Sequence, residues 1–209
     1  MGPVIWIEGI IGAGKSTLTK AVSESLGLRP IYEPVDDNEY LTPFYADPAR
    51  WAFPMQVELM ARRYAMQLLA LGEAQCGNGA ILDRGLPGDR VFAKLLMRNG
   101  HIHEREWRTY QRLYDSMTMW ITSPRLLVFL DVDPTVAMDR IRIRGREAES
   151  GMDLQYLIDL RAGYLDLLTE IESGAHAWSR GMDTMRVAWN VDHQDPNTIV
   201  EEIKHRCRL

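Results

Sequence analysis

The residues best suited to chemistry stand near the amino terminus, where residues 9–17 read GIIGAGKST and match the pattern G-x-x-x-x-G-K-[ST]. Glycines at this spacing let backbone N–H groups converge on phosphate oxygens. Lys15 can reach the β- and γ-phosphates, and the Ser16 hydroxyl can bind the Mg²⁺ that bridges them. The motif therefore predicts a phosphate-binding loop for ATP or another nucleoside triphosphate. The residues expected to contact the nucleotide are Gly9, Ile11, Gly12, Ala13, Gly14, Lys15, Ser16 and Thr17.

Charged side chains also end two apolar segments further along the chain. Glu33 ends the segment at residues 29–33, and Asp83 and Arg84 end the segment at residues 80–84. Ligands of open α/β sheets bind at the carboxyl ends of the strands, so these side chains are expected near the phosphate loop. There Asp83 can be a ligand of Mg²⁺ and Arg84 can face a phosphoryl group. An ordinary salt bridge at the sheet edge is the alternative for this pair.

Four arginines gather at the end of the helix that Pro134 begins. Arg140 and Arg144 are four residues apart and share a helix face, as do Arg142 and Arg146. A charge run of this kind is often only a solvated helix face. Beside a phosphate loop, a lid over about residues 140–151 is favoured, because guanidinium groups over a transferring phosphoryl group can contribute ~10³ to 10⁵ in rate.

Strand-like and helix-like segments alternate along the chain, which predicts an α/β fold with one parallel sheet and helices on both faces. The strands are expected at residues 4–7, 29–33, 80–84, 126–132 and 186–191. The helices are expected at residues 15–26, 51–74, 89–98, 104–119, 134–146, 153–172 and 196–206, with a loop through Tyr40, Pro43 and Tyr45. A strand before the phosphate loop and a helix after it make a chance glycine-rich turn the weaker interpretation.

Composition narrows the class of protein. With 209 residues and no repeat or linker, the chain is expected to form a single domain over residues 1–209. A net charge of −5 argues against general nucleic-acid binding, which needs a basic face. No segment approaches 18 consecutive apolar residues, and a strand beginning at Val4 leaves no room for a signal peptide, so no membrane partner is expected. Cys76 and Cys207 lack metal-ligand spacing and suit a reducing, cytoplasmic compartment.

Five blocks in order resemble the deoxyribonucleoside kinase family over nearly the whole chain. They are the phosphate loop, Glu-Pro-Val at residues 33–35, residues 45–63, Asp83-Arg84 with Asp89, and residues 140–149. Within the family the chain resembles the deoxycytidine, deoxyadenosine and deoxyguanosine kinase branch, and residues 83–94 are most similar to its bacterial members. The resemblance implies the P-loop kinase fold, five strands and an arginine-rich lid, with Mg²⁺ and ATP bound. It also implies a homodimer packed through helices, for which residues 51–74 and 104–119 are candidates.

The resemblance further implies a role for individual residues. Glu33 would accept the proton of the substrate 5′-hydroxyl, and Arg84 would hold the same oxygen and the incoming phosphoryl group. Tyr45 and Glu149 would bind the sugar 3′-hydroxyl. The residues implied for the base are Gln56, whose amide can donate and accept together, the charged pair Arg63 and Asp89, and Phe92, which would stack on the base.

The lid and the carboxyl-terminal part complete the implied site. Arg140, Arg144 and Arg146 match the family's phosphate-contacting arginines. Asp192 and Gln194 lie in the segment that matches the border of the donor adenine. The chain departs from the family at Gly85, where a serine usually follows the arginine.

These residues together predict a kinase that moves the γ-phosphoryl group of a nucleoside triphosphate to a deoxynucleoside 5′-hydroxyl, the acceptor being a purine deoxynucleoside or deoxycytidine. A nucleoside monophosphate kinase is one alternative, although Glu33 would repel the second phosphate that it needs. A non-catalytic accessory subunit is another, because fold does not determine function. Such a subunit could lose Lys15, Glu33 or Arg84, and this chain has all three.

Overall fold

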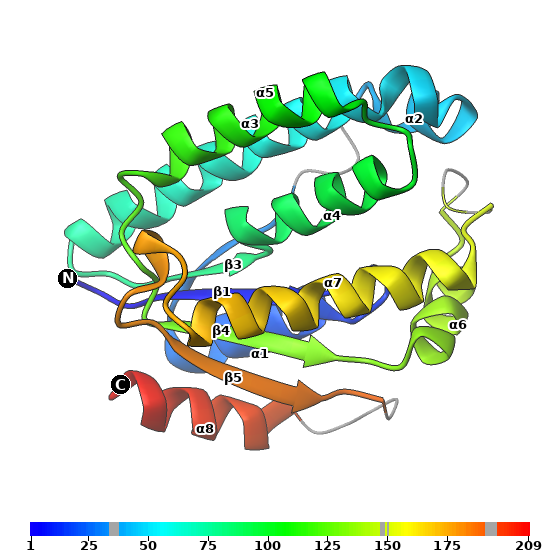
Figure 1. Ribbon diagram of the computed structural model, residues 1–209. Coiled ribbons are helices and arrows are strands. Elements are labelled where there is room, and N and C mark those ends of the chain that lie inside the picture. Colours follow the sequence, from blue (N-terminus) through cyan, green and yellow to red (C-terminus); the bar gives the residue numbers. More distant parts are fainter. Residues whose placement is uncertain (34–37, 147–148, 150, 191–195) are drawn as a thin grey trace.

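The computed structural model describes residues 1–33, 38–146, 149, 151–190 and 196–209 (Figure 1). Within these ranges, five parallel strands form one sheet in the order β2-β3-β1-β4-β5. The strands are β1 (Val4–Gly9), β2 (Arg29–Ile31), β3 (Ala80–Asp83), β4 (Leu126–Asp131) and β5 (Asp183–Ala188). The predicted parallel sheet is therefore confirmed, with β1 at its centre.

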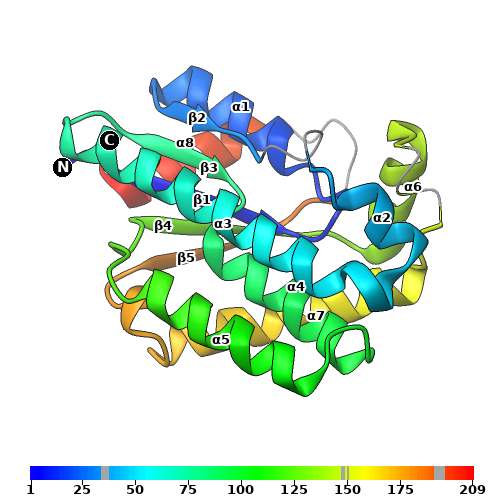
Figure 2. The ribbon, with the colours of Figure 1, turned by 90° about the horizontal axis from the view of Figure 1, so that it is seen from above.

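Helices cover both faces of this sheet. They are α1 (Lys15–Leu26), α2 (Leu41–Ala46), α3 (Pro48–Gln75), α4 (Leu86–Arg98), α5 (Glu104–Thr118), α6 (Pro134–Arg144), α7 (Leu154–Glu172) and α8 (Pro196–Cys207). Figures 1 and 2 show α1 and α8 on one face and α3, α4 and α7 on the other, with α5 outermost against α3 and α4. The short helix α2 and the helix α6 lie at the carboxyl end of the strands. None of the helices in the described ranges combines the length and apolar character needed to cross a bilayer.

Two apolar clusters hold these layers together. The larger lies between the sheet and its helices and includes residues 4–7 of β1. Such a continuous apolar run is what a parallel strand needs when both of its faces are covered. The smaller cluster joins α3, α4 and α5 through residues such as Met60, Ala93 and Tyr110. This second cluster fixes the two helices that carry Arg63 and Asp89.

The backbone of the phosphate loop requires its glycines. Gly12 and Gly14 have φ angles of 78° and 88°, in the left-handed region that favours glycine. A Cβ atom on Gly12 would lie 2.5 Å from the carbonyl oxygen of Ala137 in α6. The loop therefore has room for backbone alone, and α6 packs directly against it.

The structure corrects the segment before α3. The loop expected through Tyr45 is wrong, because Leu41–Ala46 form the helix α2. The next helix begins at Pro48 rather than at residue 51. The reason is local: the Asp47 carboxylate accepts a hydrogen bond from the Arg50 backbone N–H (3.2 Å), and proline fits the first helical position.

Several other boundaries also differ from the prediction. Strand β2 ends at Ile31, so Glu33 lies two residues beyond the strand. Strand β5 begins earlier, at Asp183, because its parallel register with β4 starts there. Helix α4 begins at Leu86, directly after Gly85 in an extended conformation.

Trp6 explains why a glycine stands at position 85. Trp6 in β1 is fully buried and is one of the largest side chains in the core. A Cβ atom on Gly85 would lie 2.7 Å from Cδ2 of the indole. The indole thus occupies the space that a side chain at position 85 would need.

We predict that Gly85→Ala lowers the free energy of unfolding by about 1–3 kcal/mol, because the added methyl group overlaps a rigid ring in a packed core. Gly72→Ala in α3 is the matched control, since a Cβ atom there meets nothing within 4 Å. It should raise the free energy of unfolding by about 0.4–1 kcal/mol. Urea denaturation measures both changes. Equal effects of the two substitutions would contradict the contact between Trp6 and Gly85.

Candidate active site

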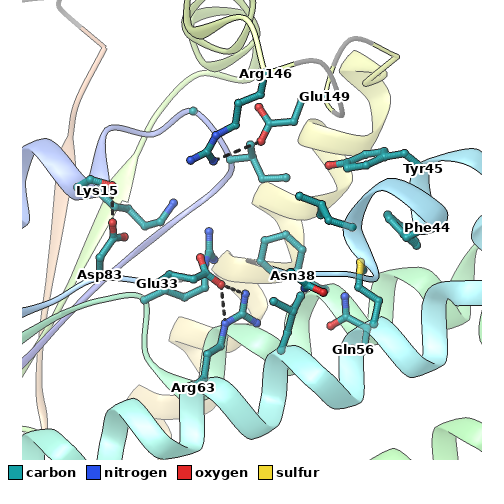
Figure 3. A pocket seen from close by; sticks show the side chains of 18 of the residues that line it. Lys15, Glu33, Asn38, Phe44, Tyr45, Gln56, Arg63, Asp83, Arg146 and Glu149 are labelled. Carbon is teal, nitrogen blue, oxygen red and sulfur yellow. Dashed lines mark hydrogen bonds and ion pairs between the residues drawn. The ribbon is translucent and has the colours of Figure 1, made fainter. Parts of the chain in front are cut away.

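A cavity of about 260 Å³ opens at the carboxyl end of the sheet (Figure 3). Its walls come from the phosphate loop, the residues at the ends of β2 and β3, the helices α2, α3, α4 and α7, and the end of α6 with the segment after it. The lining residues are Ile11, Gly12, Lys15, Ser16, Glu33, Asn38, Leu41, Phe44, Tyr45, Met55, Gln56, Leu59, Arg63, Asp83, Arg84, Phe92, Arg144, Arg146, Glu149 and Tyr156. Most of the residues that the sequence singled out therefore surround one space.

Lys15 marks the end of the cavity formed by the phosphate loop. Its Nζ donates a hydrogen bond to the Ile10 carbonyl oxygen (3.1 Å), so the amine lies across the loop. Burial and the nearby charge of Arg84 lower the pKa of Lys15 to about 8, while neighbouring carboxylates oppose the shift. The N-terminus of α1 and this amine together suit a phosphate anion.

Ser16 and Asp83 form an oxygen-rich pair beside the loop. The Ser16 hydroxyl donates a hydrogen bond to Asp83 Oδ2. Asp83 Oδ1 is buried and has no hydrogen-bond partner in the part of the chain that the structure describes. Mg²⁺ is commonly bound by one or two protein oxygens together with phosphates and water. An orphaned carboxylate oxygen next to a hydroxyl fits that requirement.

Glu33 lies in the cavity wall beside Arg63 (Figure 3), and it forms ion pairs with two arginines. Its Oε1 accepts hydrogen bonds from Arg63 Nε (2.9 Å) and Arg63 Nη2, and its Oε2 accepts one from Arg84 Nε (3.2 Å). Burial would raise the pKa of Glu33, but the charges of Arg63 and Arg84 outweigh burial and lower the pKa to about 2. Glu33 is therefore an ionised carboxylate held by two cations at neutral pH.

A second carboxylate and a tyrosine hold Arg63 from behind. Arg63 Nη1 pairs with Asp89 Oδ1, and Asp89 Oδ2 accepts a hydrogen bond from the Tyr110 hydroxyl. Asp89 is fully buried and lies outside the cavity lining. The predicted pair of Arg63 and Asp89 thus forms, but only Arg63 faces the cavity.

Arg84 is held in a similar way by another carboxylate and another tyrosine. Its Nη1 donates to the Tyr164 hydroxyl in α7 and lies 3.7 Å from Glu8 Oε2 in β1. Its φ of 78° is rare for a residue with a side chain, and such strain concentrates at functional sites. The guanidinium carbons of Arg84 and Arg63 lie 4.7 and 5.8 Å from the centre of the Phe92 ring. Phe92 therefore supports both cations from the cavity wall.

Tyr45 and Glu149 lie at the far side of the cavity from Lys15 (Figure 3). Glu149 is buried and pairs with Arg144, and its Oε1 lies 3.9 Å from Arg146 Nη1. Burial and the charge of Glu149 raise the pKa of Tyr45 to about 12. The phenol therefore stays a hydrogen-bond donor beside a carboxylate acceptor, a combination that suits a ligand hydroxyl.

Gln56 in α3 presents an amide to the same cavity. Its side chain is 1% exposed, and its Oε1 has no hydrogen-bond partner among the residues described. Buried amide oxygens are nearly always paired in proteins. A ligand edge that donates to Oε1 and accepts from the amide nitrogen would complete the pairing.

Some predicted site residues lie elsewhere. Those outside the cavity lining are Gly9, Ala13, Gly14, Thr17, Asp89 and Arg140. Arg140 Nη1 donates to the Ala13 carbonyl oxygen (3.5 Å), so from α6 it contacts the phosphate loop itself. Asp192 and Gln194 fall outside the described residues.

Sequence reasoning missed three residues of the buried network. Glu8 had a readable signal, because it is a carboxylate at the end of an apolar strand, the same pattern that drew attention to Asp83. No sequence signal pointed to Tyr110 or Tyr164. Each lies inside a long helix, where an aromatic residue ordinarily predicts core packing.

Comparisons with known proteins agree with this geometry. The family model described as deoxynucleoside kinase matches residues 5–208. The chain belongs to the deoxynucleoside kinase family. Deoxyadenosine kinase of Dictyostelium discoideum is 34% identical over 203 residues, which are 97% of this chain and 78% of that kinase. Deoxyadenosine/deoxycytidine kinase of Bacillus subtilis (strain 168) is 34% identical over 164 residues, which are 77% of this chain and 74% of that kinase.

A solved member of the deoxynucleoside kinase family has the same fold. The structure of deoxyadenosine kinase from M. mycoides with bound dATP matches with a TM-score of 0.80 and 26% identity, over 99% of this chain and 100% of that chain. The structure of the same kinase with bound dCTP matches with a TM-score of 0.79 and 25% identity, over 98% of each chain. The predicted P-loop kinase fold and the predicted deoxynucleoside phosphotransferase class are therefore confirmed.

We predict that Glu33 stabilises the folded kinase in a pH-dependent way. Its pKa is about 2 in the folded chain and about 4.3 in an unfolded one. A lowered pKa gives a contribution that is complete above about pH 5 and is lost as the pH falls toward 2, with a total of roughly 3 kcal/mol. Urea denaturation of the wild type and Glu33→Gln across this pH range measures the contribution. The arginines left without Glu33 lower the free energy of unfolding of the variant by the same amount at every pH, so they do not change the pH dependence.

Glu39→Gln is the matched control, since Glu39 is exposed. Its difference from the wild type should change little with pH. A difference between the wild type and Glu33→Gln that stays constant down to pH 3 would show that the two arginines do not lower the pKa of Glu33.

Proposed function

We propose that this deoxynucleoside kinase transfers the γ-phosphoryl group of ATP, or of another nucleoside triphosphate, to the 5′-hydroxyl of a purine deoxynucleoside or deoxycytidine. The observation that carries the proposal is Glu33, an ionised carboxylate in the cavity wall, held between Arg63 and Arg84. The relatives support the substrate class, because they include deoxyadenosine and deoxyadenosine/deoxycytidine kinases.

The phosphate loop would bind the donor. Its backbone N–H groups, the N-terminus of α1 and Lys15 offer positive charge to the phosphates. Arg144 and Arg146 line the same cavity and would stabilise the charge that develops as the phosphoryl group transfers. Arg140, which contacts the loop, would support the donor from α6.

Ser16 and Asp83 would hold Mg²⁺. The support is their oxygen pair and the orphaned Oδ1 of Asp83 among the described residues. When bound, the cation supplies positive charge to the donor phosphates. The donor adenine would lie toward residues 192–195, as the family resemblance implies.

Glu33 would orient the 5′-hydroxyl and receive its proton. Because the pKa of Glu33 is low, the carboxylate is a weak base, and the proton would transfer late, as the oxygen bonds to phosphorus and becomes acidic. Arg84 would hold the oxygen and the incoming phosphoryl group, while the bond from phosphorus to the donor diphosphate breaks. Positioning and charge stabilisation supply most of the catalysis in such a transfer.

The acceptor would be recognised at both of its ends. Tyr45 would donate a hydrogen bond to the sugar 3′-hydroxyl, and Glu149 would accept one from it. Gln56 and Arg63 would bind the edge of the base, with Phe92 against its face. Asp89 would act from behind, because its contact is with Arg63 and not with the cavity.

The same geometry disfavours the two alternatives. A monophosphate kinase would have to bind an acceptor phosphate close to the Glu33 carboxylate, where like charges repel. An accessory subunit would have no use for a buried network of Glu33, Arg63 and Arg84, which costs free energy to assemble.

We propose in addition that the kinase is a cytoplasmic homodimer. The resemblance implied α3 and α5 as the helices of the dimer interface. Large apolar side chains are exposed on both helices and on the residues just after α5. They are Leu68, Leu69, Leu113, Met119 and Trp120. A second copy of the chain would cover them. The two cysteines are free thiols, which suits a reducing compartment.

We predict that the wild type, with Mg²⁺ and labelled ATP, phosphorylates at least one purine deoxynucleoside or deoxycytidine. Glu33→Gln should lower kcat by about 10²- to 10⁴-fold, because the variant neither takes the proton nor attracts the hydroxyl as a charge. Thin-layer separation of the labelled products of each deoxynucleoside and each monophosphate measures both.

Glu39→Gln, outside the cavity lining, should retain wild-type kcat. Label transferred only to monophosphates would move the function to a monophosphate kinase. Transfer to no acceptor would leave the accessory subunit as the better explanation.

We predict that the wild type has twice the 24.0 kDa chain mass in light scattering. Leu69→Glu and Trp120→Glu should each shift the mass toward the monomer, because a buried unpaired carboxylate destabilises an apolar interface. Ile143→Glu on α6 is the control, since Ile143 is as exposed as Trp120, at 83% against 82%. A wild type of 24.0 kDa, or a loss of dimer in the control alone, would contradict this interface.

A further inference from the structure

Glu8 is a buried carboxylate close to the active site that no step of the proposed reaction uses. It is 1% exposed, lies in β1 and is outside the cavity lining. Its Oε1 accepts a hydrogen bond from the Gly85 backbone N–H (2.8 Å), and its Oε2 accepts one from the Tyr164 hydroxyl (3.0 Å). Glu8 therefore joins β1, the start of α4 and α7 at one point directly behind Arg84.

The hydrogen bonds run in one direction through this point. Arg84 Nη1 donates to the Tyr164 hydroxyl, which donates in turn to Glu8 Oε2. Both carboxylate oxygens of Glu8 act as acceptors, and Arg84 Nη1 lies 3.7 Å from Oε2. Burial raises the pKa of Glu8 above its ordinary value, and Arg84, the Gly85 N–H and Tyr164 offset only part of that shift. The pattern of acceptors is that of an ionised carboxylate that balances the arginine.

The surroundings pack closely against the Glu8 carboxylate. A Cβ atom on Gly88 in α4 would lie 2.5 and 2.8 Å from the two oxygens of Glu8 and 2.8 Å from the Tyr164 hydroxyl oxygen. The backbone of α4 therefore closes directly over the carboxylate. The ring of Tyr164 is fixed as well, because it stacks on Phe129 with centroids 5.6 Å apart.

We propose that Glu8 and Tyr164 are positioning residues that hold the Arg84 guanidinium in place for phosphoryl transfer. Arg84 has two sides: Nε faces Glu33 in the cavity, and Nη1 is bound to Tyr164 beside Glu8. When the substrate hydroxyl binds Glu33, the bond on the cavity side weakens. The bonds to Tyr164 and Glu8 keep the guanidinium from following Glu33. The inference rests on the proposed role of Arg84 in the transfer.

The test is a double-mutant cycle on the full-length chain. Tyr164→Phe removes only the hydroxyl, and Glu8→Gln removes only the charge. Each should lower kcat about 10- to 100-fold, because small misplacements of a catalytic group cost about that much. The KM values for ATP and for the deoxynucleoside should stay within about twofold, because neither residue lines the cavity. In an Arg84→Ala background, both substitutions should lower kcat no further, because they act through Arg84.

Tyr114→Phe is the matched control, because Tyr114 is also buried and its hydroxyl has no hydrogen-bond partner in the described ranges. It should keep wild-type kcat. If Glu8→Gln does not fold, Tyr164→Phe decides the question alone. An unchanged kcat in Tyr164→Phe, or an equal fall in the Arg84→Ala background, would overturn the inference. An inactive wild type would instead overturn the proposed function, so the two failures are distinguishable.

Discussion

The need to balance two buried guanidinium groups organises this active site. Arg63 and Arg84 are both about 3% exposed, and removing each cation from water costs several kcal/mol unless carboxylates compensate. Glu33 lies between them and serves both. A site built in this way has little freedom, because moving any one charge takes a partner away from another buried charge.

Each arginine also has its own support. Asp89 with Tyr110 holds Arg63, and Glu8 with Tyr164 holds Arg84. Replacing buried ion pairs by apolar residues is often neutral for stability, so stability alone does not account for two such supports. The need to fix the orientation of each guanidinium group does account for the two supports, because phosphoryl transfer depends on charges that are in place before the reaction begins.

The position of the phosphate loop depends on close packing against α6 rather than on charge. Gly12 lies against the backbone of α6 at Ala137, and α6 ends at Arg144, two residues before Arg146. The helix that carries the arginines is therefore fixed to the loop that binds the donor. In this way the fold brings Arg144 and Arg146 into the wall of the same cavity as the phosphate loop and Glu33.

Features that depend only on residues close together in the sequence were predictable from the sequence alone. The phosphate-loop motif, α1 at Lys15–Leu26 and the parallel sheet follow from glycine spacing, apolar runs and alternation, which act over a few residues. The family resemblance added further residues that line the cavity, such as Tyr45, Gln56 and Arg63. Only the tertiary structure decided that Leu41–Ala46 is helical, because a helix this short is stable only when docked.

The tertiary structure also decided which charges meet. Asp89 came to lie behind Arg63 rather than in the cavity, and Glu8 came to contact Tyr164, which is 156 positions away in the chain. No local pattern encodes such a pairing. It arises because desolvation makes each buried charge find a partner, and the packing of β1, α4 and α7 determines which partners are within reach.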